Sequence, residues 1–171
     1  MKYLFIFVLT LTTTFQLFSQ EPDNSETTTT IYYLIRHAEK DRSDKTNRDP
    51  HLTEAGNKRA ENWANVLKEV KFDKIYSTDY NRTKETATPT AKANNLELNF
   101  YDPRDMKIKE FMANTKGKNV LVVGHSNTTP MFTNGLLGEK KYEMIADDNN
   151  ANLYIVTVTE DSISAMVLVV D

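Results

Sequence analysis

The sequence predicts an α/β fold of three layers, in which helices cover both faces of a mostly parallel central sheet. Short apolar runs alternate along the chain with amphipathic helical patterns, and this alternation is typical of a sheet with helices packed on its faces. Two runs, 31–35 (IYYLI) and 119–124 (NVLVVG), are the most strongly apolar, as expected of central strands that are covered on both sides. No internal repeat and no second composition shift follows residue 31, so we expect one domain around one core.

The first 19 residues have the pattern of a signal peptide. Lys2 precedes an apolar run over 3–17, and the small residue Ser19 ends the segment. The run is rich in threonine and shorter than the about 20 apolar residues that a membrane span requires. We therefore expect cleavage after Ser19 and an exported protein, periplasmic or secreted, without stable membrane association after cleavage. An uncleaved membrane anchor is the alternative.

Residues 20–30 are expected to form a flexible linker, because EPDNSETTTT (21–30) contains no large apolar residue. The folded domain is then expected over 31–171. The chain contains no cysteine, which excludes disulfides and attachment of a lipid at the cleavage site.

The charge balance argues against a nucleic-acid-binding protein. Removal of residues 1–19 leaves 20 basic against 24 acidic side chains, a mildly acidic chain. Positive charge that attracts an anionic ligand must therefore be concentrated locally, which makes individual arginines informative. The sequence carries no signal for an oligomeric state.

The first half of the domain continues with a helix that begins after Thr53, an expected N-cap. Its apolar face is formed by Ala60, Trp63, Ala64 and Leu67, which have helical spacing. A strand over 74–77 leads into a helix that carries Arg82 in its first turn, and 96–100 gives a third strand. The order of strand, loop and helix thus repeats.

The second half is expected to begin with a short helix around 108–112, followed by the strand at 119–124. A helix with Pro130 in its early turns comes next. Two last strands, 153–159 and 163–170, flank a turn and form a hairpin that completes the sheet.

Both of the most apolar strands end at ionisable side chains. Arg36 and His37 follow the first strand, and His125 follows the second. In open α/β sheets, ligands bind beyond the carboxyl ends of the strands, so we expect these side chains to converge.

Three segments, YYLIRHAEK (32–40), IYSTDYNRTKETA (75–87) and VLVVGHSNT (120–128), resemble the histidine phosphatase superfamily, branch 1, in order and context. The resemblance covers 31–171 and implies a phosphoglycerate mutase-like fold. The chain is similar to short members of the phosphohistidine phosphatase subgroup. The family motif is Arg-His-Gly, and here Ala38 stands in the glycine position. LTEAG (52–56) also resembles a helix start of such enzymes, and we interpret it as a cap.

The resemblance implies that His37 is the nucleophile and that Arg36, Arg82 and His125 hold the phosphoryl group. This agrees with the chemistry, because in-line phosphoryl transfer depends on positioning and charge stabilisation. Arginine forks bind phosphate in a bidentate manner, and nearby arginines are expected to lower the pKa of His37. A phosphohistidine intermediate would then be hydrolysed by water, with no metal and no cofactor.

The start of the helix after His125 is expected to add anion-binding donors, the backbone N–H groups of Ser126 and Asn127. His51 is interpreted as a turn residue. For the general acid that protonates the leaving alcohol, we select Asp102, which follows the third strand. The alternatives are Glu39, Asp147 and Asp148, and short family members can lack the standard acid.

Other functions remain open at this point. GHSNT resembles a hydrolase nucleophile elbow with Ser126 as nucleophile, although Thr128 replaces the final glycine. A pseudo-phosphatase that binds phosphorylated ligands without turnover is a non-enzymatic alternative. A mutase-type phosphotransferase or a protein phosphohistidine phosphatase is possible within the family, but export favours a phosphomonoesterase that acts on small external substrates. The charged loop 39–49 is a candidate for substrate selection.

Overall fold

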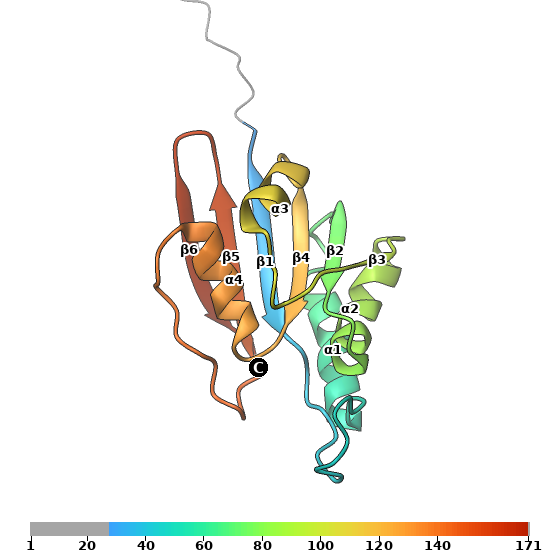
Figure 1. Ribbon diagram of the computed structural model, residues 1–171. Helices are drawn as coiled ribbons and strands as arrows, with labels where there is room; N and C mark the ends of the chain where they lie inside the picture. Colours follow the sequence, from blue (N-terminus) through green and yellow to red (C-terminus); the bar gives the residue numbers. More distant parts are fainter. Residues whose placement is uncertain (1–27, 171) are drawn as a thin grey trace, which may run out of the picture.

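The computed structural model describes residues 28–170 and shows a sheet between two helical layers (Figure 1). The predicted signal peptide, 1–19, and the predicted linker up to residue 27 lie outside the described residues. Within the described part, no helix has the length and apolar character needed to cross a bilayer.

The sheet contains six strands in the order β3-β2-β4-β1-β5-β6. Pairing is parallel from β3 through β1, whereas β5 is antiparallel to both β1 and β6. The strands are β1 (Thr30–Arg36), β2 (Lys74–Ser77), β3 (Leu98–Phe100), β4 (Asn119–Gly124), β5 (Asn152–Val158) and β6 (Ile163–Val169). The structure thus confirms the predicted mixed sheet and its final hairpin.

Four helices cover the two faces of this sheet. They are α1 (Glu54–Val66), α2 (Asn81–Ala93), α3 (Ile108–Asn114) and α4 (Thr128–Leu137). Phe111 of α3 and Phe132 of α4 pack on one face, whereas Trp63 of α1 and Ala87 of α2 pack on the other. Figure 1 shows α3 and α4 in front of the sheet and α1 and α2 behind it. The three predicted layers are therefore present.

Alternate residues of the central strands point to opposite faces, which explains their continuous apolar runs. Tyr32 and Leu34 of β1 lie in the same core cluster as Phe132, while Ile35 lies in the cluster around Trp63. Several boundaries differ from the prediction by one or two residues. In particular, β1 begins at Thr30, whose side chain is buried, and β3 begins only at Leu98.

The segment LTEAG fastens the loop after β1 to the start of α1. The Thr53 hydroxyl accepts the Gly56 N–H at 3.0 Å, which confirms the predicted cap. The Thr53 backbone N–H donates to the Glu39 carbonyl at 2.9 Å. A Cβ at position 56 would lie 2.2 Å from that same carbonyl oxygen, so only glycine allows this approach.

Gly56→Ala is therefore expected to displace the loop that follows β1 and to lower the free energy of unfolding by about 1–3 kcal/mol. Thermal and urea unfolding would measure this change. Gly138→Ala is not a suitable control, because Gly138 has a φ of 75° and strain would follow there for another reason. Ala55→Gly, on the exposed side of the same turn, tests whether the effect is specific to position 56. Unchanged stability of Gly56→Ala would contradict this account.

Candidate active site

The register of β1 and β4 brings the two predicted histidines together. Arg36 and Gly124 are paired in the parallel ladder, and each histidine directly follows one of them. The His37 N–H donates to the Gly124 carbonyl at 2.9 Å, and the imidazole centroids of His37 and His125 lie 5.5 Å apart. Both strand ends point to the same edge of the sheet in Figure 1. The convergence expected from the sequence is thus present.

The buried His37 imidazole has its protonation fixed by one hydrogen bond. Its Nδ1 lies 2.7 Å from the Ala38 carbonyl, which can only accept, so Nδ1 carries the proton and Nε2 carries the lone pair. Burial lowers the pKa of His37 to about 3, although the bond to Ala38 opposes the shift, and the charges of His125, Arg36 and Arg82 lower it further. The expected lowering by arginines is present, but burial is its largest cause. His37 is thus a neutral imidazole with a free Nε2.

Two residues that sequence reasoning missed hold the backbone around His37. The Asn150 amide donates to the His37 carbonyl at 2.6 Å, and the Thr86 hydroxyl accepts the Ala38 N–H at 2.9 Å. Asn150 and Thr86 are both buried. Asn150 lies 113 residues from His37, so no local spacing could have indicated this contact.

Ala38, which replaces the family glycine, fits its position without strain. The residue is fully buried and packs in a small apolar cluster with Leu52 and Ala60. Its methyl group therefore occupies space that would otherwise be empty, and this packing accounts for the departure from the motif.

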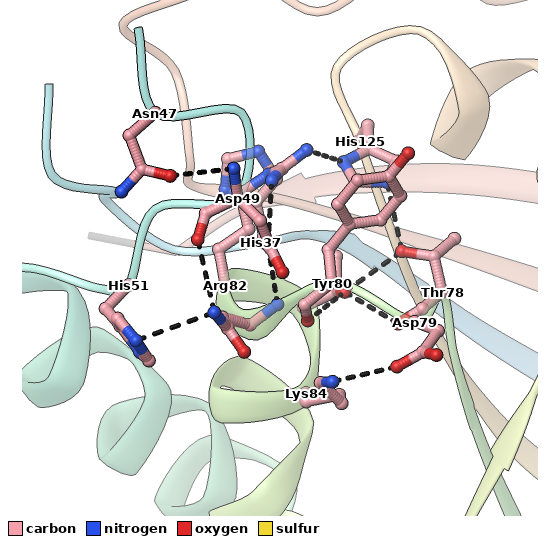
Figure 2. Close-up of polar contacts among 12 residues, drawn as sticks. His37, Asn47, Asp49, His51, Thr78, Asp79, Tyr80, Arg82, Lys84 and His125 are labelled. Carbon is pink, nitrogen blue, oxygen red and sulfur yellow. Dashed lines mark hydrogen bonds and ion pairs between the residues drawn. The ribbon is translucent and has the colours of Figure 1, made fainter. Parts of the chain in front are cut away.

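His125 is oriented by a threonine pair (Figure 2). The Thr78 hydroxyl donates to the Thr83 hydroxyl at 2.9 Å, because the Thr83 proton goes to the Thr78 carbonyl at 2.8 Å. The Thr78 oxygen is then free to accept the His125 Nε2–H at 3.0 Å. Nδ1 of His125 consequently carries a lone pair, which faces Arg82 Nη2 at 3.5 Å. Burial and the charge of Arg82 lower the pKa of His125 to about 4.

Arg82 lies in the first turn of α2 with most of its side chain buried. Its Cζ lies 4.5 Å from the centroid of the Tyr80 ring, and its Nη1 lies 3.5 Å from Asp49 Oδ1. Nε and Nη1 are buried without a hydrogen-bond partner. Arg82 also lines the pocket, and a guanidinium charge beside a histidine is suited to bind a phosphoryl group.

Asp49 positions the start of α2 and thereby Arg82, a role that the sequence did not indicate. Its carboxylate accepts the Asn81 N–H at 2.8 Å, and its carbonyl accepts the Asn81 amide at 3.1 Å. Figure 2 shows Asp49 close to Arg82. His51 lies at the same corner, exposed and paired with Glu85, in agreement with its interpretation as a turn residue.

Arg36 is more fully engaged by the protein than the sequence predicted. Its Nη1 donates to the carbonyls of Ala146 and Asn149 at 2.7 and 2.8 Å, and its Nη2 donates to Asp147 at 3.0 Å. Nε is buried without a partner. Arg36 therefore organises the loop before β5, and it lines the pocket with its positive charge but has no free fork to offer a phosphate.

These side chains line a pocket of about 900 Å³ that is strongly basic. Five cationic residues line it, against the single carboxylate of Asp147: Arg36, Lys40, Arg82, Arg104 and Lys107. The local concentration of positive charge that the acidic chain required is thus present. Sequence reasoning missed Lys40, Arg104 and Lys107, although Lys40 lies only three residues after His37.

The structure corrects the choice of Asp102 as general acid, because Asp102 does not line this pocket. Its carboxylate accepts the Arg104 N–H at 2.8 Å, the turn geometry typical of aspartate, and lines a neighbouring hollow. That hydrogen bond also holds the pKa of Asp102 below its usual range. The contacts of Asp102 are thus those of a turn residue, and they do not place its carboxylate at the leaving group.

The alternative carboxylates are also occupied. Glu39 pairs with Arg59 at 2.7 Å and does not line the pocket. Asp147 does line it, but Asp147 pairs with Arg42 and Arg36, and hydrogen bonds from these arginines lower its pKa. Asp148 lines a separate shallow hollow. Within residues 28–170, the pocket therefore contains no carboxylate without a cationic partner.

Ser126 and Asn127 line the pocket at the start of α4, as expected of anion-binding donors. Asn127 is the N-cap residue and forms no side-chain cap. The alternative with Ser126 as nucleophile lacks a base, because the described contacts of His37 and His125 go to Ala38, Thr78 and Arg82. No group of three or more metal-ligating side chains is present in the described part.

We expect the three histidines of the chain to titrate in two separate ranges. The imidazoles of His37 and His125 should remain neutral at pH 5.5, whereas the bond to Glu85 raises the pKa of His51 above its ordinary value near 6.5. Two-dimensional NMR of the imidazole nitrogens would measure this. Titration of all three near pH 6.5 would contradict the burial described here.

The lowered pKa values of His37 and His125 also make the free energy of unfolding depend on pH. The unfolded chain binds protons at His37 and His125 below about pH 6.5, where the folded chain does not. Their contribution to stability is therefore complete above that pH and is lost as the pH falls towards their folded pKa values.

A family model matches the first half of the folded domain. The model of the histidine phosphatase superfamily (branch 1) matches residues 32–103, which include Arg36, His37 and Arg82. No curated protein matches the sequence.

Solved structures share the fold at low identity. The putative phosphohistidine phosphatase SixA from Agrobacterium tumefaciens is 21% identical, with 81% of this chain and 97% of that chain covered and a TM-score of 0.59. The protein histidine phosphatase SixA complexed with tungstate is 16% identical, with 81% and 96% covered and a TM-score of 0.66. Phosphoglycerate mutase from Bacillus anthracis is 17% identical, with 83% and 93% covered and a TM-score of 0.64. The model of the histidine phosphatase superfamily, branch 1, thus matches the part of this chain that carries Arg36, His37 and Arg82, and the solved structures show that the chain has the same fold as histidine phosphatases and a phosphoglycerate mutase.

Proposed function

We propose that this chain is an exported phosphomonoesterase that hydrolyses small phosphorylated molecules through a phosphohistidine intermediate on His37, without a metal. The observation that carries the proposal is that a neutral, buried His37 and the Arg82 guanidinium line the same basic pocket. A free Nε2 can attack phosphorus, and the adjacent guanidinium can stabilise the charge of the transition state.

The proposed reaction has two steps, formation and hydrolysis of the phosphohistidine. In the first step, the Nε2 lone pair of His37 forms a bond to phosphorus, and the bond from phosphorus to the leaving oxygen breaks with its electron pair on that oxygen. The leaving oxygen takes a proton from solvent water, and the water that attacks in the second step releases one proton to solvent. The Arg82 guanidinium lies where it can hold the equatorial oxygens, and the lone pair on His125 Nδ1 faces its Nη2 and helps to orient it. In the second step, water attacks the phosphohistidine, the P–N bond breaks, and inorganic phosphate leaves with His37 neutral again. The net reaction consumes one water and releases an alcohol and phosphate.

The proposal that the protein is exported rests on the signal-like segment 1–19. It favours a scavenging role on external monoesters over mutase activity or dephosphorylation of protein phosphohistidine, because the substrates of those reactions are cytoplasmic. Localisation of the full chain, followed by N-terminal sequencing of the mature protein, tests this part separately.

Trapping of the intermediate tests the mechanism. Brief exposure to a ³²P-labelled monoester, followed by denaturation, is expected to leave label on the protein that is labile in acid and stable in base. Mass spectrometry should place it on His37. A base-labile ester on Ser126 would instead support the serine mechanism and refute the phosphohistidine.

Because the carboxylate that lines the pocket is paired with cations, we expect kcat/KM to depend strongly on the leaving group. Without a proton donor, the leaving oxygen departs with its charge, so kcat/KM should be much higher for 4-nitrophenyl phosphate than for an alkyl phosphate. General acid catalysis contributes typically about 10²–10⁴-fold, and we expect a difference of that order. Steady-state kinetics over a series of aryl and alkyl phosphates would measure it.

Equal rates across that series would reveal a proton donor and contradict this account. Tight phosphate binding without turnover of 4-nitrophenyl phosphate would support the alternative of a pseudo-phosphatase.

A further inference from the structure

We propose that the outer part of the pocket is a subsite for a second anionic group of the substrate, held by Arg104 and Lys107. This inference rests on the proposed function and names the class of substrate: a phosphate monoester whose leaving group carries a carboxylate or another anion. The subsite is formed by the segment between β3 and α3, away from the two strand ends that carry the histidines.

The size of the pocket is the first argument. Its volume of about 900 Å³ lies at the upper end of the range for sites that hold a whole small molecule. The phosphoryl group is accounted for by the deep end, where His37, Arg82 and His125 meet. The remaining volume is therefore available for the leaving group.

The distribution of charge is the second argument. The segment 102–107 contains two carboxylates and two cations, and the carboxylates and the cations line different hollows. Arg104 and Lys107 line the His37 pocket, whereas Asp102 and Asp105 do not line it and lie on the neighbouring hollow, which Lys107 also reaches. A segment without net charge thus presents positive charge to the substrate.

The ion pairs within this segment leave the cations available. Arg104 Nε lies 3.4 Å from Asp102, and Lys107 Nζ lies 3.8 Å from Asp105. All four side chains are exposed, and pairs of this length in water are weak. An anionic group in the pocket can therefore recruit both cations at little cost.

Part of the pocket lining is apolar. Met106, Ile108 and Met131 line the pocket together with Pro103, and Met131 is 56% exposed. An apolar spacer such as an aromatic ring fits such walls, since methionine adapts to ligands of irregular shape. The expected ligand thus has phosphate at one end, an apolar spacer, and an anion at the other.

Matched probes test the proposal: 4-carboxyphenyl phosphate and the neutral 4-carbamoylphenyl phosphate, with their 3-substituted isomers. For each of Arg104→Ala and Lys107→Ala, we expect kcat/KM for the carboxylates to fall by about fivefold at low salt, and further in the double variant. Values for the neutral amides should stay unchanged. Lys109→Ala, an exposed lysine of α3 outside the pocket, is the control and should alter neither.

The ratio of kcat/KM for the carboxylate to kcat/KM for the amide is compared between each variant and the unaltered protein. This comparison cancels the difference in reactivity between the two leaving groups. Equal losses for both probes, or no loss for either, would overturn the subsite. Failure of all probes to turn over would refute the proposed phosphatase activity. Calorimetric binding of the same probes to His37→Ala then tests the subsite. The carboxylate probe should bind more tightly than the amide probe, and this difference should disappear in a variant that also carries Arg104→Ala and Lys107→Ala.

Discussion

Replacement of His37 by alanine is expected to reduce kcat for 4-nitrophenyl phosphate by about 10³-fold or more, because it removes the proposed nucleophile. The fold should persist, since the His37 backbone would still bond to Gly124 and Asn150. Steady-state kinetics, with circular dichroism to check folding, would measure both quantities.

His51→Ala is the matched control, because this imidazole is exposed and lies outside the pocket. It should retain the activity of the unaltered protein. Substantial activity in His37→Ala, or a comparable loss in His51→Ala, would remove His37 from the role of nucleophile.

The second large effect is expected at Arg82. Arg82→Ala should lower kcat by about 10²–10³-fold, the loss typical of removing one charge-stabilising donor from a preorganised site. Arg82→Lys should restore only part of the activity, because an ammonium offers a point charge without the planar fork. The principal effect should fall on kcat, with a smaller one on KM.

Arg48→Ala is the control for the loss of one arginine. Arg48 is exposed in the neighbouring loop and does not line the pocket, so its replacement should leave kcat unchanged. A loss in Arg82→Ala that appears only in KM would mean that Arg82 binds substrate and transition state equally. Arg82 would then be a binding residue without a catalytic contribution.

Much of the fold was predictable because its signals are local. The apolar runs at 31–35 and 119–124 and the cap at Thr53 lie within a few residues of the structures that they specify, and all three are confirmed. The boundary of β3 was less predictable, because Leu98 pairs with Ile75 of a strand 23 residues away and short edge strands depend on such pairing.

The sequence by itself determined which residues form the deep site. His37, Arg82 and His125 each lie at the end of a strand or in the first turn of a helix, and parallel strands bring their carboxyl ends to one edge of a sheet. The convergence of His37 and His125 therefore follows from local patterns together with one general property of the fold, whereas Arg82 was assigned through the resemblance to the family.

Only the tertiary structure decided how these residues are used. The support of His37 by Asn150, the engagement of Arg36 by the loop at 146–149, and the exclusion of Asp102 from the pocket all depend on contacts and orientations that sequence spacing does not encode. Protonation was decided in the same way, because burial lowers the pKa of His37 more than its charged neighbours do. Burial is a property of the packed chain, and no motif in the sequence specifies it.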